Sequence, residues 1–181
     1  MPLMATHPSL RFWVAGCGTG EEAYSIAIIL YEEGLLERSL IYATDIDEAS
    51  LQAAEAGVYD IGRVQGFSEN YFRAGGRASL SNYYTAAKSN VTIDPLLRNH
   101  ILFSDHSLAT DSAFAETQLV SCRNVLIYFD RELQTRAIGL FRASLCPRGF
   151  LGLGSKETLM FSDHAAAFEA LADDQPIYRV K

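Results

Sequence analysis

Apolar residues cluster in short runs that alternate with segments of helical spacing along most of the chain. The runs are rich in strand-forming residues and end at turn residues, which is typical of buried strands. They cover residues 11–15, 40–44, 100–103, 118–122, 150–153 and 177–180. Between them, apolar residues at helical spacing predict helices over residues 21–33, 47–57, 130–145 and 162–172. Asp47 is the expected N-cap of the second helix and Gly57 its stop.

Residues 58–99 break this rhythm. They contain several glycines, a polar stretch at 77–82 and a tyrosine pair at 83–84 before the apolar run 91–93. The composition predicts a short helix followed by a small antiparallel excursion. Regular alternation resumes at the strand predicted for residues 100–103.

Strands that alternate with helices form a parallel sheet that helices cover on both faces. The 181 residues are enough for one domain with a substantial buried core. Ligands of such sheets bind beside the carboxyl ends of the strands. The sequence therefore predicts an α/β domain whose site lies where the first strands end.

The composition is that of an ordinary globular protein, with 49% hydrophobic and 20% charged residues. No apolar run approaches the roughly 20 residues that cross a bilayer. Residues 1–11 lack the charged start and the apolar stretch of a signal peptide, so a cytoplasmic location is expected. Cys17, Cys122 and Cys146 are odd in number, sit among apolar residues and lack metal-ligand spacing. We expect them to be core residues, with no disulfide and no metal site.

The formal net charge of −7 argues against general nucleic-acid binding, which demands a basic surface. The charge is uneven, because residues 60–90 hold four bases and two acids. This locally basic segment either steers an acidic partner or forms an ordinary solvated surface.

The sequence GCGTG at residues 16–20 follows the first predicted strand and opens a helix. Its spacing is G-x-G-x-G, whereas the dinucleotide fingerprint is G-x-G-x-x-G. Glu21 and Glu22 in the first helical turn would repel a pyrophosphate but attract a ligand that carries an ammonium and a sulfonium. S-adenosylmethionine carries both, and its candidate contacts here are Gly16, Gly18, Gly20, Glu21 and Glu22. The alternative is a structural turn with two acids that favour the helix dipole.

Asp45 ends the second predicted strand, 29 residues after Gly16. A carboxylate at this position suits hydrogen bonds from both ribose hydroxyls of a nucleoside. Asp47 lies on the same turn, where we favour its role as the helix cap.

The sequence SCRNVLIYFD at residues 121–130 forms a second group of polar residues after a buried strand. Asn124 can exchange hydrogen bonds with a ligand amine or carboxylate, and Arg123 offers a planar fork for a carboxylate. Tyr128 supplies a donor for a substrate oxygen. The alternative places Arg123 in an ion pair and Tyr128 in the core.

Four segments together resemble the CheR-type chemotaxis-receptor methyltransferases. They are GCGTGEEAYSIA at 16–27, ATDID at 43–47, CRNVLIYFD at 122–130 and GSKE at 154–157, in order and at plausible spacing. The resemblance covers residue 11 to the C-terminus, and the run 122–130 is more specific than any glycine turn.

The resemblance implies a class I S-adenosylmethionine-dependent methyltransferase fold, a Rossmann-like, seven-stranded, mostly parallel sheet. Residues 58–99 would be a small inserted β-subdomain, which in the family contacts the receptor. The implied cofactor contacts are the glycine turn, Glu21 or Glu22, Asp45, the Ser107-Leu108 dipeptide and the Arg123-Asn124 dipeptide. Tyr128 is similar to the family tyrosine near the point of methyl transfer. The usual pattern has asparagine in place of Ser107, so the contact on the adenine side is expected to differ.

Family members carry a helical domain before this one, with an N-x-T-x-F-x-R segment that reaches over the cofactor. About ten residues precede the first predicted strand here, and none match that segment. We therefore expect the helical domain to be absent from a chain that is a fragment, one domain of a larger protein or a reduced member. The isolated chain is then not expected to be fully active.

The resemblance implies that the chain transfers methyl groups from S-adenosylmethionine to glutamate side chains of chemoreceptors. Arg123 or Tyr128 would orient the acceptor carboxylate, and no general base is needed because glutamate is ionised at neutral pH. The main alternative is a non-catalytic module that binds S-adenosylmethionine or docks on a receptor. Two others are a methyltransferase for a small molecule or nucleic acid and a nicotinamide-dependent oxidoreductase, which the acids at residues 21–22 disfavour.

Overall fold

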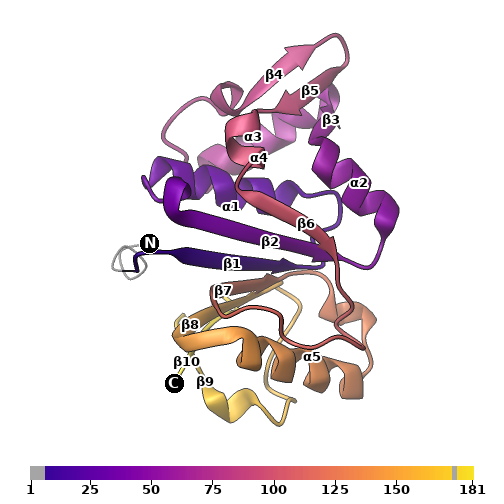
Figure 1. Cartoon of the computed structure of the whole chain (residues 1–181), viewed down its shortest axis with the longest axis vertical. Coiled ribbons are helices and arrows are strands. Elements are labelled where there is room, and N and C mark those ends of the chain that lie inside the picture. The colour runs from indigo at the N-terminus through magenta and orange to yellow at the C-terminus, as the bar shows by residue number, and fades with distance from the viewer. Residues whose placement is uncertain (1–6, 173–174) are drawn as a thin grey trace.

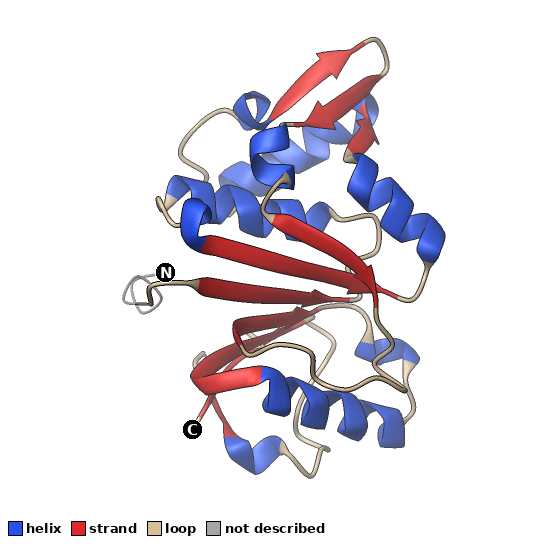
Figure 2. Ribbon diagram, viewed as in Figure 1, coloured by secondary structure: helices blue, strands red, loops and turns tan. Residues whose placement is uncertain are grey.

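A seven-stranded sheet runs through the middle of the molecule in the computed structural model, which describes residues 7–172 and 175–181 (Figure 2). Its strands are β1 (Leu10–Ala15), β2 (Ser39–Asp45), β6 (Ile101–Asp105), β7 (Thr117–Cys122), β8 (Leu145–Leu153), β9 (Phe168–Ala170) and β10 (Ile177–Val180). They lie in the order β6-β2-β1-β7-β8-β10-β9. Each of the six predicted strands is present, so the expected strand pattern is confirmed apart from the additional β9.

The first five strands in this order are parallel, and β10 is antiparallel to both of its neighbours. The chain builds outward from β1 to β2 and β6 and then returns to the other side of β1 with β7. A reversal of this kind leaves a crevice at the carboxyl ends of the central strands. The arrowheads of β1, β2 and β6 point to the same edge of the sheet (Figure 1).

Helices cover both faces of this sheet, as predicted. They are α1 (Glu21–Glu32), α2 (Glu48–Ala56), α3 (Val64–Arg73), α4 (Pro95–Arg98) and α5 (Arg131–Ser144). Side chains of β1 alternate between the faces. Leu10, Phe12 and Val14 join one buried cluster with residues of α1, whereas Trp13 and Ala15 join another with residues of α5. All five are at most 1% exposed, which is why β1 anchors both layers.

The predicted boundaries of α2 are confirmed by its caps. The carboxylate of Asp47 accepts a hydrogen bond from the Ser50 amide at 3.2 Å. Gly57 follows the helix with a φ of 63°, a left-handed conformation that glycine adopts without strain. Asp130 caps α5 in the same way as Asp47 caps α2, through the Leu133 amide at 2.9 Å.

A small antiparallel sheet lies within residues 58–99, at the end of the molecule away from α5 (Figure 1). It consists of β3 (Val58–Asp60), β5 (Asn90–Ile93) and β4 (Tyr84–Ala87), in that order. The antiparallel excursion is therefore confirmed. The strand β3, which precedes the helix α3, was not expected. We call residues 58–99 the inserted segment, and its limits remain a prediction.

Charged and polar groups attach the inserted segment to α1. Tyr71 and Tyr83 both donate hydrogen bonds to Glu32, the second at 2.9 Å. Arg77 forms an ion pair with Glu33 at 3.0 Å. Part of the excess positive charge of residues 60–90 is therefore compensated by an ion pair within the chain.

The helix predicted for residues 162–172 is wrong. One turn of 3₁₀ helix, η6 (Ala165–Ala167), precedes the strand β9. Phe168 is 6% exposed and packs in the core beside α5, and it pairs with Val180 of β10. Pairing with β10 provides hydrogen-bond partners for the backbone of this segment. This tertiary contact outweighs the helical preference of its alanines. Residues 147–149 form an irregularity within β8, where Arg148 has a φ of 62°.

The three cysteines are buried and free, as expected. Within the described part of the chain, no helix has the length and apolarity to span a bilayer.

Candidate functional site

Five chain segments leave the sheet at its carboxyl edge, and each carries residues singled out by the sequence. They follow β1 at residues 16–20, β2 at 45–47, β6 at 105–108, β7 at 122–124 and β8 at 154–157. Register places the ends of β1, β2 and β7 side by side, because Ala15 pairs with Thr44 and Val14 pairs with Ser121. The candidate residues therefore meet at one edge.

The glycine turn is tied to the end of β2 and lies against the segment after β7. The amides of Gly16 and Cys17 donate to the Thr44 carbonyl at 2.8 and 2.9 Å. A Cβ at Gly16 would lie 2.3 Å from a methyl carbon of Val125. The first and third glycines of the turn thus serve close packing, since a Cβ at Gly20 would lie 2.9 Å from that of Ala54.

Gly18 differs from these two glycines. Its φ is 52°, and a Cβ there would meet no described atom within 4 Å. Packing within the protein therefore does not explain this glycine. Its left-handed conformation, which glycine adopts without strain, does explain it.

Asp45 is held by the backbone of the turns around it. Oδ2 accepts from the Gly18 amide at 2.8 Å, and Oδ1 accepts from the amides of Ile46 at 2.8 Å and Asp47 at 3.1 Å. Two carboxylate oxygens offer about four acceptor positions, so capacity remains for a ligand hydroxyl. The neighbouring thiol is unreactive, because burial and then the charge of Asp45 raise the pKa of Cys17 to about 12.

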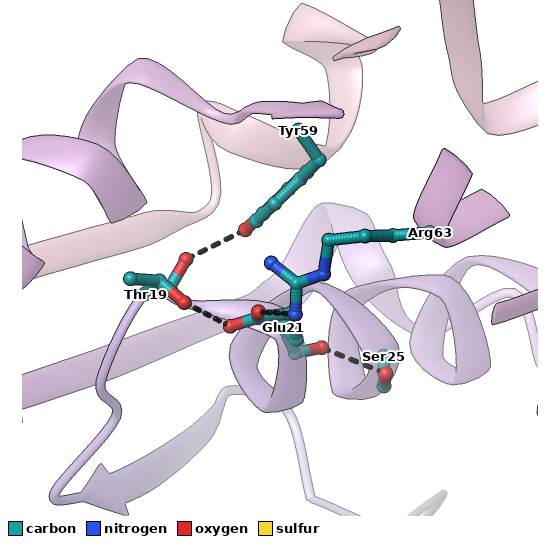
Figure 3. Close-up of polar contacts among 5 residues, drawn as sticks. All are labelled: Thr19, Glu21, Ser25, Tyr59 and Arg63. Atoms are coloured by element: carbon teal, nitrogen blue, oxygen red, sulfur yellow. Dashed lines mark hydrogen bonds and ion pairs between the residues drawn. The ribbon is translucent and has the colours of Figure 1, made fainter. Parts of the chain in front are cut away.

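Glu21 is engaged by residues of the protein (Figure 3). Its carboxylate accepts from the Thr19 hydroxyl at 2.7 Å and forms an ion pair with Arg63 at 2.5 Å. Burial by itself raises the pKa of Glu21, but the hydrogen bond from Thr19 and the contact with Arg63 outweigh it and hold the pKa below its usual range. Glu21 is therefore ionised, and the charge of Arg63 compensates its own.

Glu22 lies on the other side of the helix start. Its carboxylate accepts a short hydrogen bond from the hydroxyl of Ser121, near the end of β7. This contact places Glu22 between the glycine turn and the segment that holds Arg123. The two glutamates, which the sequence left as alternatives, thus have different surroundings.

The segment after β7 is organised by one buried carboxylate. Glu157 is 8% exposed and accepts hydrogen bonds from four backbone amides: Asn124 at 3.1 Å, Val125 at 2.9 Å, Leu126 at 2.8 Å and Gly154 at 2.6 Å. Asn124 has a φ of 59°, a left-handed conformation that asparagine tolerates better than most residues. A Cβ at Gly154 would lie 2.9 Å from the Asn124 nitrogen, which explains the glycine of the GSKE sequence.

Arg123 and Tyr128 are exposed at this edge. Tyr128 is 81% exposed, so it is not a core residue. Arg123 is also exposed and forms no ion pair within residues 7–172 and 175–181. Both side chains are therefore accessible to an acceptor substrate.

Ser107 and Leu108 follow β6, and neither side chain is fully exposed. Leu108 is 6% exposed and packs with Trp13 in the core, so its side chain faces away from solvent. The Ser107 amide donates to Asp111 at 2.8 Å.

Sequence reasoning missed several residues that organise the site. The GSKE sequence was noticed, but the four amide contacts of Glu157 depend on the fold. Tyr59 and Arg63 reach the glycine turn from the inserted segment, and no local pattern signals this. Ile46 is 72% exposed although it is apolar. Its exposure depends on the fold, so the sequence alone did not single it out.

A cavity lies elsewhere, near the opposite edge of the sheet. It has a volume of about 270 Å³ and is lined by Gln118, Cys146 and Arg148, which lie near the amino ends of β7 and β8. The candidate site at the carboxyl edge is thus separate from this cavity.

Comparison with known proteins agrees with this geometry. The family described as CheR methyltransferase, SAM binding domain, matches residues 2–175. The Pseudomonas putida protein Cher3, which is named as a methyltransferase, is 58% identical over 179 residues, covering 99% of this chain and 66% of that protein. Chemotaxis protein methyltransferase 2 of Pseudomonas aeruginosa is 35% identical over 164 residues, covering 87% of this chain and 56% of that one. The chain thus spans between about half and two thirds of these two relatives.

Among solved structures, the DszA carbon methyltransferase superposes with a TM-score of 0.53 at 14% identity. The match covers 91% of this chain and 34% of that one. At this identity the likeness concerns the fold, and it confirms the expected methyltransferase architecture.

Proposed function

This chain belongs to the CheR methyltransferase family, and we propose that it transfers methyl groups from S-adenosylmethionine to glutamate side chains of chemoreceptor proteins. Its cofactor is S-adenosylmethionine, as the matched domain states. The acceptor, the chemoreceptor partner and a cytoplasmic location are parts of the proposal.

The observation that carries this proposal is the meeting of two carboxylates and a bare backbone at one sheet edge. Asp45 and Glu22 flank the turn that contains Gly18. The cofactor has a ribose with two hydroxyls, and it has an ammonium and a sulfonium with positive charge. Carboxylates accept hydrogen bonds from the ribose hydroxyls and attract the positively charged ammonium and sulfonium. These two carboxylates therefore fit this cofactor, and their negative charge disfavours a diphosphate.

We assign Asp45 to the ribose hydroxyls and Glu22 to the methionine ammonium. The backbone of Gly16, Gly18 and Gly20 admits the cofactor at the turn, while Asn124 faces the methionine end. The loop backbone at residues 107–108 lies on the adenine side. Glu21 acts indirectly, because Arg63 occupies its carboxylate.

When bound, S-adenosylmethionine supplies an electrophilic methyl group on its sulfonium. The chain's residues need to align an acceptor oxygen with that methyl and to exclude water. Arg123 offers a fork that matches a carboxylate, and Tyr128 offers a hydroxyl donor. A glutamate acceptor is already ionised at neutral pH, so we assign no general base.

The inserted segment is the proposed receptor contact, as the family resemblance implies. Its strand β4 exposes Thr85, Ala86 and Ala87 at the edge of the small sheet. An edge strand of this kind can pair with an extended peptide.

The test combines binding with transfer. Calorimetry measures S-adenosylmethionine binding to the chain, and a tritiated-methyl assay measures transfer to receptor-containing membranes. We expect binding together with base-labile label on the receptor, because methyl esters hydrolyse in base. Binding without transfer would instead support a non-catalytic module, and base-stable label would point to another acceptor group.

A further inference from the structure

Two side chains of the inserted segment reach the glycine turn (Figure 3). The Tyr59 hydroxyl donates to the Thr19 carbonyl at 2.7 Å, and Arg63 forms its ion pair with Glu21 at 2.5 Å. Thr19 in turn donates its hydroxyl to Glu21 at 2.7 Å. The three contacts link Tyr59, Thr19, Glu21 and Arg63 in one chain across a sequence separation of about forty residues.

Both side chains are held by aromatic packing. Tyr59 is 6% exposed and makes edge contacts with Tyr24 and Phe67. The Arg63 guanidinium lies 5.0 Å from the Phe67 ring centroid and 5.7 Å from that of Tyr59. An arginine stacked on two rings is restricted before it meets its carboxylate, so the ion pair costs little further ordering.

This network separates the two glutamates. Glu21 is directed toward the inserted segment and is neutralised there. Glu22 is directed toward Ser121, near the end of β7. Near the turn, Glu22 is then the helix-start carboxylate that can meet a cationic ligand group.

We propose that Tyr59 and Arg63 are positioning residues of the cofactor site, which fix the glycine turn through Thr19 and Glu21 and leave Glu22 to bind the methionine ammonium. This inference rests on the cofactor assignment made above. It makes the inserted segment a structural part of the cofactor site in addition to a receptor contact.

A matched control exists within the same segment. Arg77 also joins the inserted segment to α1, but through Glu33 at the far end of that helix. Its side chain is 72% exposed and that of Arg63 is 50% exposed, so both pairs are partly screened by solvent. Replacing Arg77 therefore shows how attachment of the inserted segment to α1 affects ligand binding. Replacing Arg63 shows in addition how the position of the glycine turn affects it.

The experiment measures binding of S-adenosylhomocysteine and of 5′-methylthioadenosine by calorimetry. Both ligands are thioethers with the same nucleoside, but the second lacks the amino-acid group. Their affinity ratio therefore reports contacts to the ammonium and carboxylate alone. The variants are Glu21→Gln, Glu22→Gln, Tyr59→Phe, Arg63→Gln and Arg77→Gln, each also melted without ligand.

Glu22→Gln should lower the affinity for S-adenosylhomocysteine about tenfold or more, because a charge-assisted contact is lost. It should leave the affinity for methylthioadenosine unchanged. The affinities for both ligands should fall by a similar factor, about three- to tenfold, in Arg63→Gln, Tyr59→Phe and Glu21→Gln, since the turn is less fixed. Combining Arg63→Gln with Glu21→Gln should add no further loss. Arg77→Gln should bind both ligands as the unchanged chain does.

Two outcomes would overturn the inference. One is that Glu21→Gln, and not Glu22→Gln, changes the affinity ratio. The other is that Arg63→Gln and Tyr59→Phe bind both ligands as Arg77→Gln does. Methyl transfer is not part of this experiment, so an absence of transfer would count against the proposed function alone and would leave this inference standing.

Discussion

Glu157 shows how a single residue organises the site without reaching a ligand. Its buried carboxylate accepts from four amides of two segments that follow different strands, β7 and β8. These four hydrogen bonds fix the backbone conformation of the segment that contains Arg123 and Asn124. A carboxylate is suited to this task because it accepts at both oxygens and donates at neither.

Replacing Glu157 by Gln should therefore destabilise the fold by about 2 kcal/mol, because the amide nitrogen cannot accept and leaves buried donors unpaired. Urea denaturation at pH 7 measures the change in the free energy of unfolding. Glu37→Gln is the control, since the Glu37 side chain is 88% exposed, and it should change stability by less than about 0.5 kcal/mol. Equal stability of the two variants would show that the four bonds contribute nothing net.

Tyr128 allows a test of chemistry without disturbing the fold. Because it is 81% exposed, Tyr128→Phe should leave the melting temperature and S-adenosylmethionine affinity unchanged. If its hydroxyl orients the acceptor, single-turnover methyl transfer should fall about tenfold or more. Tyr31→Phe, on a half-exposed side chain of α1, is the control. Unchanged transfer by Tyr128→Phe would remove this residue from the catalytic group.

At the scale of elements, the sequence predicted what depends on neighbours along the chain. Strand runs, the Asp47 cap and the Gly57 stop are local signals, and they were correct. The strand β9 was missed because its pairing with β10 is a tertiary contact. The same division applies to the site. Asp45 and Asn124 could be placed because strand ends of a parallel sheet converge, whereas Arg63 and Tyr59 reach the turn only through the packing of the inserted segment.

The glycine turn makes a prediction at this scale. Gly18 and Gly34 both have left-handed φ values, 52° and 68°, and a Cβ at either would meet no described atom within 4 Å. Alanine should thus cost about 1 kcal/mol of stability at each position. Only Gly18→Ala should also weaken S-adenosylmethionine, measured by calorimetry, because Gly34 lies beyond the other end of α1. Equal cofactor affinity in both variants would mean that the turn backbone does not approach the ligand.

At the scale of the whole molecule, the net charge of −7 is distributed so that acids in α1 and at its C-cap contact the locally basic residues 60–90. Glu21, Glu32 and Glu33 all accept contacts from residues 60–90. The local basic excess therefore has a structural use, and the charge available for steering a partner is smaller than the sequence alone indicated.

This arrangement predicts that acid loosens the inserted segment first. Burial raises the pKa of Glu32, but hydrogen bonds from Tyr71 and Tyr83 outweigh it and hold the pKa below the ordinary 4.5. The pKa of Glu21 is also held below 4.5. A carboxylate with a lowered folded pKa contributes stability that is present above its unfolded pKa and is lost as pH falls through the folded pKa.

Hydrogen exchange, normalised to the unfolded-chain rate at each pH, measures this directly. Between pH 7 and pH 5 the protection of residues 58–99 should be constant. Below about pH 4.5 it should fall before that of β1 and β2, because the main sheet does not depend on these two carboxylates. A Glu21→Gln, Glu32→Gln double variant should already be less protected in residues 58–99 at pH 7 and should lose this selective response to acid. If β1 and residues 58–99 lost protection together in the unchanged chain, the carboxylates of α1 would not be what attaches the inserted segment.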